Sequence, residues 1–185
     1  MKVLGISGGL RRASHNTSLL HAAAELLPDG VVLELWGGLK AVPPYDEDDD
    51  VEPAPAAVTD LRDAIAGADA ILIATPEYNH SVPGQLKNAI DWASRPLATN
   101  PLRNKPVAVV GASMGAFGAV WAQAELRKVL AATAARVVEG EVAVGHAHEK
   151  FDADGRFIDE ALRETLGEVV DALVTVTRAR DMLAA

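Results

Sequence analysis

The sequence predicts an α/β protein in which helices cover both faces of a parallel β-sheet. Three observations support this fold class: strand-length apolar runs alternate with helix-period segments, most of these runs are apolar throughout, and glycine-containing polar loops follow three of them. A strand that is covered by helices on both faces is apolar on both sides, whereas a half-exposed strand alternates. We therefore expect a three-layer α/β/α arrangement.

Five strands are expected, joined by helices. The apolar runs lie at 2–7, 31–35, 70–75 and 106–113, and a split fifth strand occupies 136–138 and 142–144. Between the runs, apolar residues recur at the spacing of one buried helix face. These stripes contain Leu19, Leu20, Ala23, Leu26 and Leu27; Val58, Leu61 and Ile65; Leu86, Ala89, Ile90 and Ala93; Leu126, Val129 and Leu130; and, from about Asp159 onward, Leu162, Leu166, Val169, Val170 and Leu173.

The length of 185 residues and the lack of a Pro- or Gly-rich linker predict a single domain over 1–185. The stretch 36–56 departs from the pattern because it holds four of the ten prolines beside an acidic run at 46–50. This composition predicts a long loop. The acidic run could bind a divalent cation, but the spacing of its carboxylates is not that of a metal-ligand set. We therefore interpret the run as part of a solvated loop.

Composition excludes several classes of chemistry. With no cysteine, the chain has no disulfide, thiolate nucleophile, iron–sulfur cluster or cysteine-bound zinc, so redox chemistry would need an organic cofactor or a non-thiolate metal. The net charge of −9 argues against a nucleic-acid or anionic-membrane partner. Because the apolar runs have only strand length and no signal-peptide pattern opens the chain, we expect a soluble, cytoplasmic protein.

The first polar loop, 7–17, leaves the first strand and opens a helix. Gly8 and Gly9 let backbone N–H groups approach a ligand, and the helix N-terminus carries partial positive charge. The glycines match neither the dinucleotide fingerprint nor the Walker sequence, so a terminal monophosphate fits better than a pyrophosphate or triphosphate. The alternative is that one polar group merely caps the helix and the arginines are solvated. The side-chain donors in this loop are those of Arg11, Ser14, Asn16 and Thr17.

Two further polar loops follow the third and fourth strands. In the loop that begins at Pro76, this residue and Pro83 fix φ at both ends, which orders the backbone toward a flat ligand. Small residues at 111–119 let a planar group or a second chain approach the backbone. We interpret His80 as a surface histidine and Trp92 as a core or interface residue. The three loops converge only if strands one, three and four are neighbours, which predicts the order 2-1-3-4-5.

Two of the loops resemble the motifs of one enzyme family. The first resembles Gly-Ser-Leu-Arg-x-Gly-Ser-x-Asn, and the second resembles Pro-Glu-Tyr-Asn-x-Ser-x-Pro-Gly-x-Leu-Lys-Asn-x-Ile-Asp-Trp, of the NADPH-dependent FMN reductases. This family includes chromate, quinone and azo-dye reductases with a flavodoxin-like fold. The likeness covers nearly the whole chain, and the second motif is long enough to be highly specific.

The resemblance implies a set of cofactor-binding residues. Gly9 stands where the family usually has serine, so Ser7 or further backbone donors would have to compensate, and Ala13 stands where the family usually has glycine. Trp121 stands where many relatives carry arginine, so an apolar contact would replace a charged contact between subunits. Carried over by position, Arg11, Ser14 and Asn16 hold the FMN phosphate, Pro76, Glu77, Tyr78 and Asn79 line the isoalloxazine and ribityl, and Ser113, Met114 and Gly115 contact the flavin.

The resemblance also implies an activity. NADPH or NADH would reduce bound FMN, and the electrons would pass to a quinone, flavin, chromate, azo or nitro acceptor by a ping-pong mechanism. No catalytic side chain and no metal ligand is assigned, because the flavin carries the chemistry. The family implies a homodimer or homotetramer.

Three alternatives stay open from the sequence. A flavodoxin-like electron carrier without its own NAD(P)H turnover usually clamps the flavin between aromatic rings, whereas only Tyr78 and Phe117 lie near this site. A receiver-type signalling domain needs an aspartate at the end of strand three, where this chain has Pro76 and Glu77. The third alternative is a nucleotide-binding role without turnover.

Overall fold

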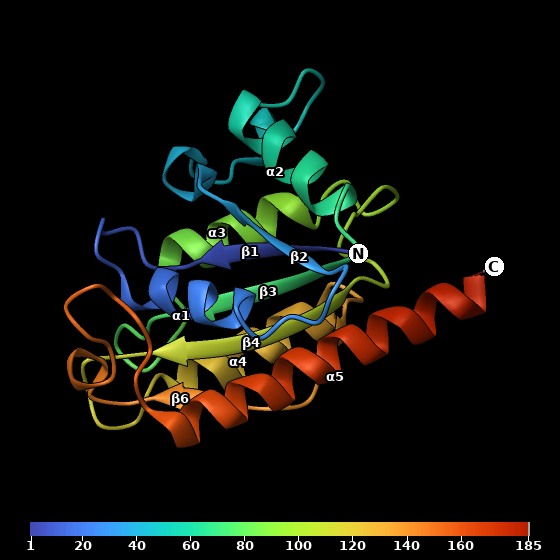
Figure 1. The fold of residues 1–185 in the computed structure, drawn as a ribbon. Helices are drawn as coiled ribbons and strands as arrows, with labels where there is room; N and C mark the ends of the chain where they lie inside the picture. Colours follow the sequence, from blue (N-terminus) through green and yellow to red (C-terminus); the bar gives the residue numbers. More distant parts are fainter. Residues whose placement is uncertain (185) are drawn as a thin grey trace.

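A parallel sheet forms the centre of the protein (Figure 1). The computed structural model describes residues 1–184. The strand order is β2-β1-β3-β4-β5, and β6 also pairs with β4. Because every pair is parallel, the carboxyl ends of the strands meet at one edge of the sheet. The strands are β1 Lys2–Ser7, β2 Val32–Trp36, β3 Ala70–Thr75, β4 Pro106–Ala112, β5 Arg136–Val137 and β6 Ala143–Val144.

The predicted order 2-1-3-4-5 and the flavodoxin-like fold class are confirmed. The second strand lies one residue later than predicted, and the fourth ends at Ala112, one residue earlier. The split fifth strand is real. Its two pieces pair with different parts of β4, since Arg136 lies beside Pro106 and Ala143 lies beside Gly111. The sheet therefore has five positions and six strands.

Strand side chains alternate between two separate cores. Leu72 of β3 points into the core on one face, and its neighbours Ile71 and Ile73 point into the core on the other. In the same way Val110 of β4 faces the first core and Val109 faces the second. This alternation follows from the two-residue period of a strand, and burial on both sides explains why the strands are apolar at every position.

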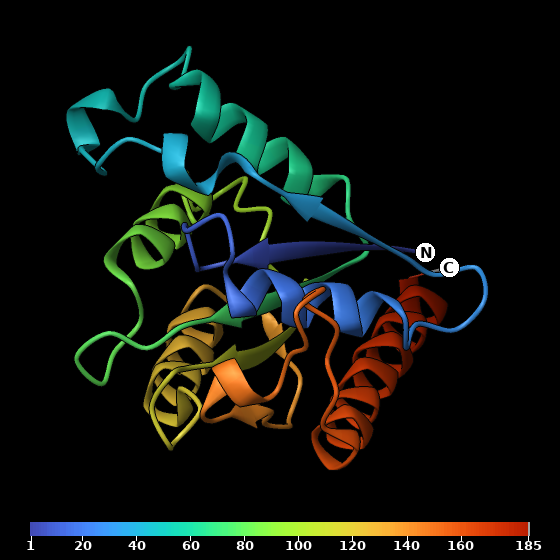
Figure 2. The ribbon, with the colours of Figure 1, turned by 60° about the vertical axis from the view of Figure 1, so that its left-hand side comes forward.

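Two helices cover one face and three cover the other (Figure 2). The first pair is α1 His15–Ala24 and α5 Glu160–Ala184, and the second set is α2 Ala56–Ala66, α3 Gly84–Ala93 and α4 Val120–Ala132. The apolar stripes predicted from the sequence face these cores, with one exception. Leu26 and Leu27 follow the end of α1, although both still pack against the first core.

The long loop predicted at 36–56 spans 37–55 in the structure, because Trp36 ends β2 and Ala56 begins α2; it contains two short 3₁₀ turns, Gly38–Ala41 and Glu47–Asp49. Hydrogen bonds tie it to α3: the Trp92 indole N–H donates to the Pro43 carbonyl at 2.9 Å, and the Tyr45 N–H donates to Asn88 Oδ1 at 2.7 Å. Trp92 is fully buried, which confirms its interpretation as a core residue. Among residues 1–184, none of the helices combines the length and apolar content needed to cross a membrane.

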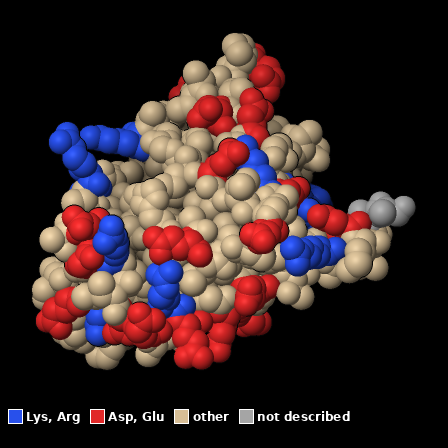
Figure 3. Space-filling view, in the orientation of Figure 1, with Lys and Arg blue, Asp and Glu red and all other residues tan. Residues whose placement is uncertain are grey.

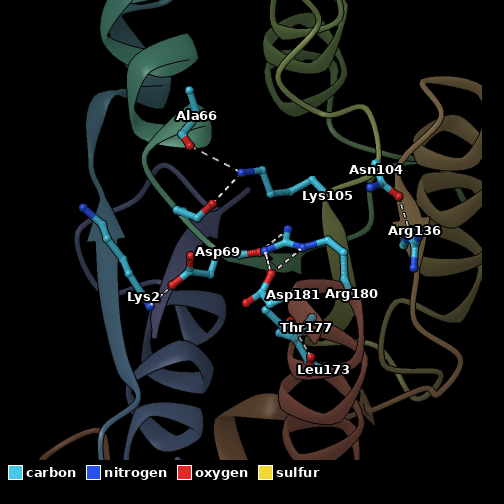
Figure 4. A network of polar contacts seen from close by, with 11 residues as sticks. Lys2, Ala66, Asp69, Asn104, Lys105, Arg136, Leu173, Thr177, Arg180 and Asp181 are labelled. Atoms are coloured by element: carbon cyan, nitrogen blue, oxygen red, sulfur yellow. Dashed lines mark hydrogen bonds and ion pairs between the residues drawn. The ribbon is translucent and has the colours of Figure 1, made fainter. Parts of the chain in front are cut away.

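Polar contacts close the amino edge of the sheet, opposite the polar loops (Figure 4). Asp69 accepts from the Lys2 N–H at 2.7 Å through its carboxylate, and its carbonyl accepts from Arg180 of α5 at 2.9 Å. Lys105 donates to the Ala66 carbonyl at 3.4 Å, near the end of α2. Burial, and after it the nearby Arg180 charge, lowers the pKa of Lys105. These groups satisfy the ends of neighbouring elements, so we assign them a structural role.

Truncation of Leu173 tests the docking of α5. Its side chain is 1% exposed within the first core. We expect Leu173→Ala to lower the free energy of unfolding by about 2–5 kcal/mol, because it leaves a cavity that the sheet cannot fill. Urea denaturation measures the change. Leu97→Ala, at a leucine that is 69% exposed, is the matched control and should change stability by less than about 0.5 kcal/mol. Equal effects of the two variants would contradict this packing.

Candidate functional site

The three polar loops converge on one cavity at the carboxyl edge of the sheet. They follow β1, β3 and β4, which are neighbours in the sheet, and the cavity of about 190 Å³ opens to solvent. Every predicted site residue except Ser7, Asn79 and Gly115 lines it. The lining residues are Gly9, Arg11, Ser14, His15, Asn16, Pro76, Glu77, Tyr78, Ala112, Ser113 and Met114.

One end of the cavity is built to hold an anion. The first N–H groups of α1 have no partner within the helix, and they carry its partial positive charge. Ser14 is the residue before this helix; it is buried, lines the cavity and uses its hydroxyl for no capping hydrogen bond. A Cβ atom built on Gly9 would lie 2.0 Å from the Ser14 Oγ. Glycine at position 9 therefore leaves the space in which the Ser14 hydroxyl lies.

Charge around this end differs from that of the molecule as a whole. The net charge is −9, yet Arg11 and Arg12 are exposed in the loop after β1. Figure 3 shows basic side chains projecting at the end of the molecule where this loop lies, with acidic side chains spread over the lower rim. The local positive potential favours a negatively charged ligand at the start of α1.

His15 is a lining residue that the sequence reasoning missed. Its ring stacks on Phe151 at a centroid distance of 5.4 Å, and Phe151 stacks in turn on Phe157. Burial lowers the pKa of His15, and the charges of Arg11 and His148 lower it further. The signal available in the sequence was its position, one residue after Ser14 at the first turn of the helix.

Asn16 joins two of the loops. Its amide Nδ2 donates to the Ala112 carbonyl at 3.0 Å, and its Oδ1 accepts from the Ala112 N–H at 2.9 Å. Both groups are buried. The side chain thus fixes the start of α1 against the end of β4. Direct contact of Asn16 with a phosphate stays a prediction, and its positioning role is what the hydrogen bonds define.

The loop after β3 contains a tight turn. Tyr78 and Ser81 exchange backbone hydrogen bonds of 3.2 and 3.1 Å, and between them Asn79 and His80 have left-handed backbones with φ of 53° and 59°. Asn79 therefore lies at the tip of the turn, outside the cavity, while Tyr78 lines its mouth. The predicted contact between Asn79 and a cofactor stays a prediction.

Glu77 ties the loop after β3 to α4. Its Oε2 accepts from the backbone N–H groups of Trp121 and Ala122, at 3.0 and 3.1 Å, in the first turn of that helix. The carboxylate is 11% exposed, and its Oε1 lies 3.6 Å from the His80 Nδ1. A carboxylate at a helix N-terminus accepts hydrogen bonds from free N–H groups, and its negative charge interacts favourably with the positive end of the helix dipole. Glu77 lines the cavity as predicted, but its charge faces the helix.

The loop after β4 is held by a segment that the sequence reasoning did not connect with the site. Ser113 donates its N–H to the Val144 carbonyl at 3.0 Å, and the Gly115 carbonyl accepts from the His146 N–H at 3.0 Å. Gly118 has φ of 58°, and a Cβ there would lie 2.3 Å from the Ala143 carbonyl carbon. Gly115 is thus a backbone anchor of the loop, and Ser113 and Met114 form the wall.

Ser7 lies on the other side of the first loop. Its hydroxyl accepts from the Thr17 hydroxyl at 2.9 Å and from the Gly9 N–H at 3.3 Å. It lines a neighbouring hollow together with Trp36 and Lys40. Compensation by Ser7 for the missing serine at position 9 stays a prediction, and the structure gives Ser7 the role of holding the loop.

Fold and cavity together define a mononucleotide-binding protein of flavodoxin-like topology, and comparison with known proteins identifies its family. Residues 1–149 match the model of the family described as NADPH-dependent FMN reductase. The chain belongs to this family. The resemblance stated above is confirmed, and with it the class of NAD(P)H-dependent oxidoreductase that uses FMN.

Relatives of known name match nearly the whole chain. An NAD(P)H-dependent FMN reductase of Pseudomonas aeruginosa is 45% identical over 94% of this chain and 93% of its own. A 2-hydroxy-1,4-benzoquinone reductase of a Burkholderia species is 38% identical over 97% of this chain and 98% of its own. The solved structure of FerB, a flavoenzyme NAD(P)H:(acceptor) oxidoreductase from Paracoccus denitrificans, superposes with a TM-score of 0.84 at 35% identity, over 97% of this chain and 98% of its own.

The residues present fit FMN. A phosphate needs N–H and hydroxyl donors with positive charge, which the start of α1, Ser14 and Arg11 provide. A flat ring system needs apolar walls with few polar groups, which Pro76, Met114 and the neighbouring backbone provide. Among residues 1–184, no cluster of His, Asp and Glu side chains has the geometry of a metal site.

Removal of the Glu77 carboxylate tests its cap on α4. We expect Glu77→Ala to lower the free energy of unfolding of the apoprotein by about 1–2 kcal/mol, because two N–H groups lose their partner. Glu77→Gln keeps an oxygen acceptor without the charge and should recover part of this loss. Urea denaturation measures both variants. Wild-type stability of Glu77→Ala would show that water replaces the cap at no cost.

Proposed function

We propose that the protein holds FMN in this cavity, with the phosphate at the start of α1 and the ring system across the loops after β3 and β4. It takes electrons from NADPH or NADH and passes them to a small-molecule acceptor by a ping-pong mechanism. The observation that supports this most directly is the convergence of the three loops on one cavity whose anion-binding end lies at a helix N-terminus. When bound, FMN supplies the redox chemistry of hydride acceptance and electron delivery.

The protein's own residues bind and position in this proposal. Arg11, the Ser14 hydroxyl and the first N–H groups of α1 hold the phosphate. Asn16 and Glu77 are positioning residues, because they fix the loops against one another through Ala112 and α4. No side chain is assigned as acid or base. Tyr78 and Met114 are exposed at the mouth, which leaves room for donor and acceptor to bind in turn.

The names of the relatives support quinones as acceptors. Relatives that are 37% identical, from Escherichia coli and Pseudomonas putida, are named quinone reductases, and the Burkholderia relative is named for a hydroxybenzoquinone. Free flavin, chromate, azo and nitro compounds are the other acceptors in the proposal. A chain that oxidises NAD(P)H works where that donor is made, which supports a cytoplasmic location. We further propose one flavodoxin-like domain over 1–185, assembled as a homodimer or homotetramer.

A visible spectrum of the purified protein tests the proposed function. We expect a yellow protein with flavin absorbance that bleaches when NADPH or NADH is added without oxygen, and that recovers its colour when a quinone is added. Comparison of the two donors at equal concentration gives the donor preference. A folded protein that stays colourless and takes up no added FMN would overturn the proposal. A coloured protein that neither donor bleaches would favour an electron carrier.

The titration of His15 predicts how FMN affinity depends on pH. Its pKa is lowered in the ligand-free protein, and a phosphate dianion in the cavity would raise it. Affinity is therefore greatest when His15 is protonated and falls as pH rises through the pKa that it has in the complex. We expect the FMN Kd to rise with pH over the range in which the phosphate stays a dianion.

His15→Phe is the matched control, because it keeps a ring to stack on Phe151 and removes the titration. Quenching of flavin fluorescence measures the Kd of both proteins, with riboflavin as the ligand that lacks a phosphate. A steady Kd for FMN in the variant and for riboflavin in both proteins is the expected pattern. The same rise in Kd with pH in both proteins would remove His15 from the phosphate site.

A further inference from the structure

A second hollow lies on the other side of the loop after β1, at the carboxyl ends of the neighbouring strands β1 and β2, and we call it the β1–β2 hollow. Its volume is about 320 Å³, which is within the range of small-molecule sites, roughly 300–1,000 Å³. Gly9 lines both this hollow and the cavity described above, so the two share a wall. The lining residues are Ser7, Gly9, Leu10, Thr17, Leu35, Trp36, Gly37, Leu39 and Lys40.

The walls of the β1–β2 hollow are mostly apolar, and part of this apolar surface is in contact with water. Leu10 is 45% exposed and Leu35 is 39% exposed, although leucine side chains are ordinarily buried. Trp36 adds an indole ring to the same lining. The hydrophobic effect favours a ligand group that removes this surface from water, and a flat ring suits a narrow space between such walls.

Hydrogen bonds fix the walls in place. The Trp36 indole N–H donates to Asp60 Oδ2 at 2.7 Å, and a Cβ atom on Gly38 would lie 2.5 Å from the Trp36 Cζ2, so the ring lies directly on the backbone of Gly38. Gln85 of α3 donates to the Leu39 carbonyl at 2.8 Å and so holds the turn that carries the lysine. A site with ordered walls loses little conformational freedom when a ligand binds.

One cation of the β1–β2 hollow has no partner. Lys40 is exposed, and within residues 1–184 its ammonium group makes no ion pair and no hydrogen bond. No aspartate or glutamate is among the lining residues, and Arg11 and Arg12 are exposed in the adjoining loop. In a chain with a net charge of −9, these groups make a local positive potential, which favours an anionic group on the ligand.

We infer that the β1–β2 hollow is a second ligand site, separate from the cavity proposed for FMN, and that it takes a flat aromatic ring carrying an anionic group. The ring lies among Leu10, Leu35 and Trp36, and the anion pairs with Lys40. Aromatic carboxylates and nucleoside monophosphates share this chemistry. The inference does not depend on electron transfer, because it rests on the lining, the fixed walls and the unpaired cation.

NMR signals of the three tryptophan indole N–H groups test the inference, in the purified protein with excess FMN. Trp36 lines the hollow, Trp92 is fully buried and Trp121 lies on α4, so the signals report on different places. The spectrum of Trp36→Phe assigns the signal. We expect 1-naphthoate or adenosine monophosphate to shift the Trp36 signal in a saturable manner and to leave the Trp121 signal unchanged. The probe that binds more tightly identifies the source of the ligand.

A neutral probe and a charge deletion isolate the contribution of Lys40. 1-Naphthamide has the ring of 1-naphthoate without its charge, and should bind the wild type roughly two- to fivefold more weakly, the effect of one exposed ion pair. Lys40→Ala keeps the apolar walls and should bind both probes equally. Lys128→Ala, which removes an exposed lysine on α4, is the matched control and should bind 1-naphthoate as the wild type does.

Three outcomes overturn the inference. The first is that neither anionic probe shifts the Trp36 signal at millimolar concentration, or that only the Trp121 signal moves. The second is an equal Kd for 1-naphthoate in the wild type and Lys40→Ala. The third is a Trp36 signal that moves with protein concentration alone while light scattering shows a larger mass, which assigns the hollow to a contact between copies of the chain. Flavin absorbance of the same samples tests the proposed function separately, because the shift of the Trp36 signal needs no bound flavin.

Discussion

Two hydrogen bonds between Asn16 and Ala112 fix the start of α1 against the end of β4, and the shape of the cavity depends on this contact. They are made inside the protein, between the first turn of α1 and the last residue of β4. A buried N–H or carbonyl that loses its partner costs about 1–3 kcal/mol, so the pair is strongly favoured over any arrangement that leaves Ala112 unpaired. The loop after β1 and the loop after β4 are therefore held at a fixed distance from each other.

Other contacts hold the remaining loop in the same way. Glu77 connects the loop after β3 to α4, and the Gly8 N–H donates to the Ala74 carbonyl at 2.8 Å, which connects the first loop to the end of β3. The loop after β4 is held from its far side by the segment 143–147. Each loop is thus fixed by an element other than the two that it joins. A cavity ordered in this way loses little conformational freedom when a ligand binds.

Most of the fold could be predicted from the sequence, because a strand that is buried on both faces is apolar at every position and is easily recognised. The runs at 2–7 and 70–75 coincide with β1 and β3, and the polar loops alone led to the correct strand order. The cavity lining could also be predicted in large part, since loops at the ends of neighbouring parallel strands must meet. A resemblance to a family supplied the ligand, which spacing alone limited only to a monophosphate.

The orientation of individual side chains could not be predicted. Asn16 and Ala112 are 96 residues apart, and nothing in the local spacing shows that the amide faces β4 instead of the ligand. The same holds for Glu77, whose partners on α4 lie 44 and 45 residues away. Polar residues in a binding loop have two uses, contact with the ligand and support of the loop. Only the tertiary structure separates them, because both uses need the same donors and acceptors.

The division between support and contact separates the buried end of the cavity from its mouth. The end of the cavity at the start of α1 depends on the buried, paired amide of Asn16 and on Gly9, where any side chain would displace the Ser14 hydroxyl. The mouth is lined by the exposed side chains of Tyr78 and Met114, which contribute little to the core. Residue 121 contributes only its backbone N–H to the Glu77 cap, so its side chain is free to vary without loss of the hydrogen bond. A change of side chain there leaves the hydrogen bonds between Glu77 and the first turn of α4 in place.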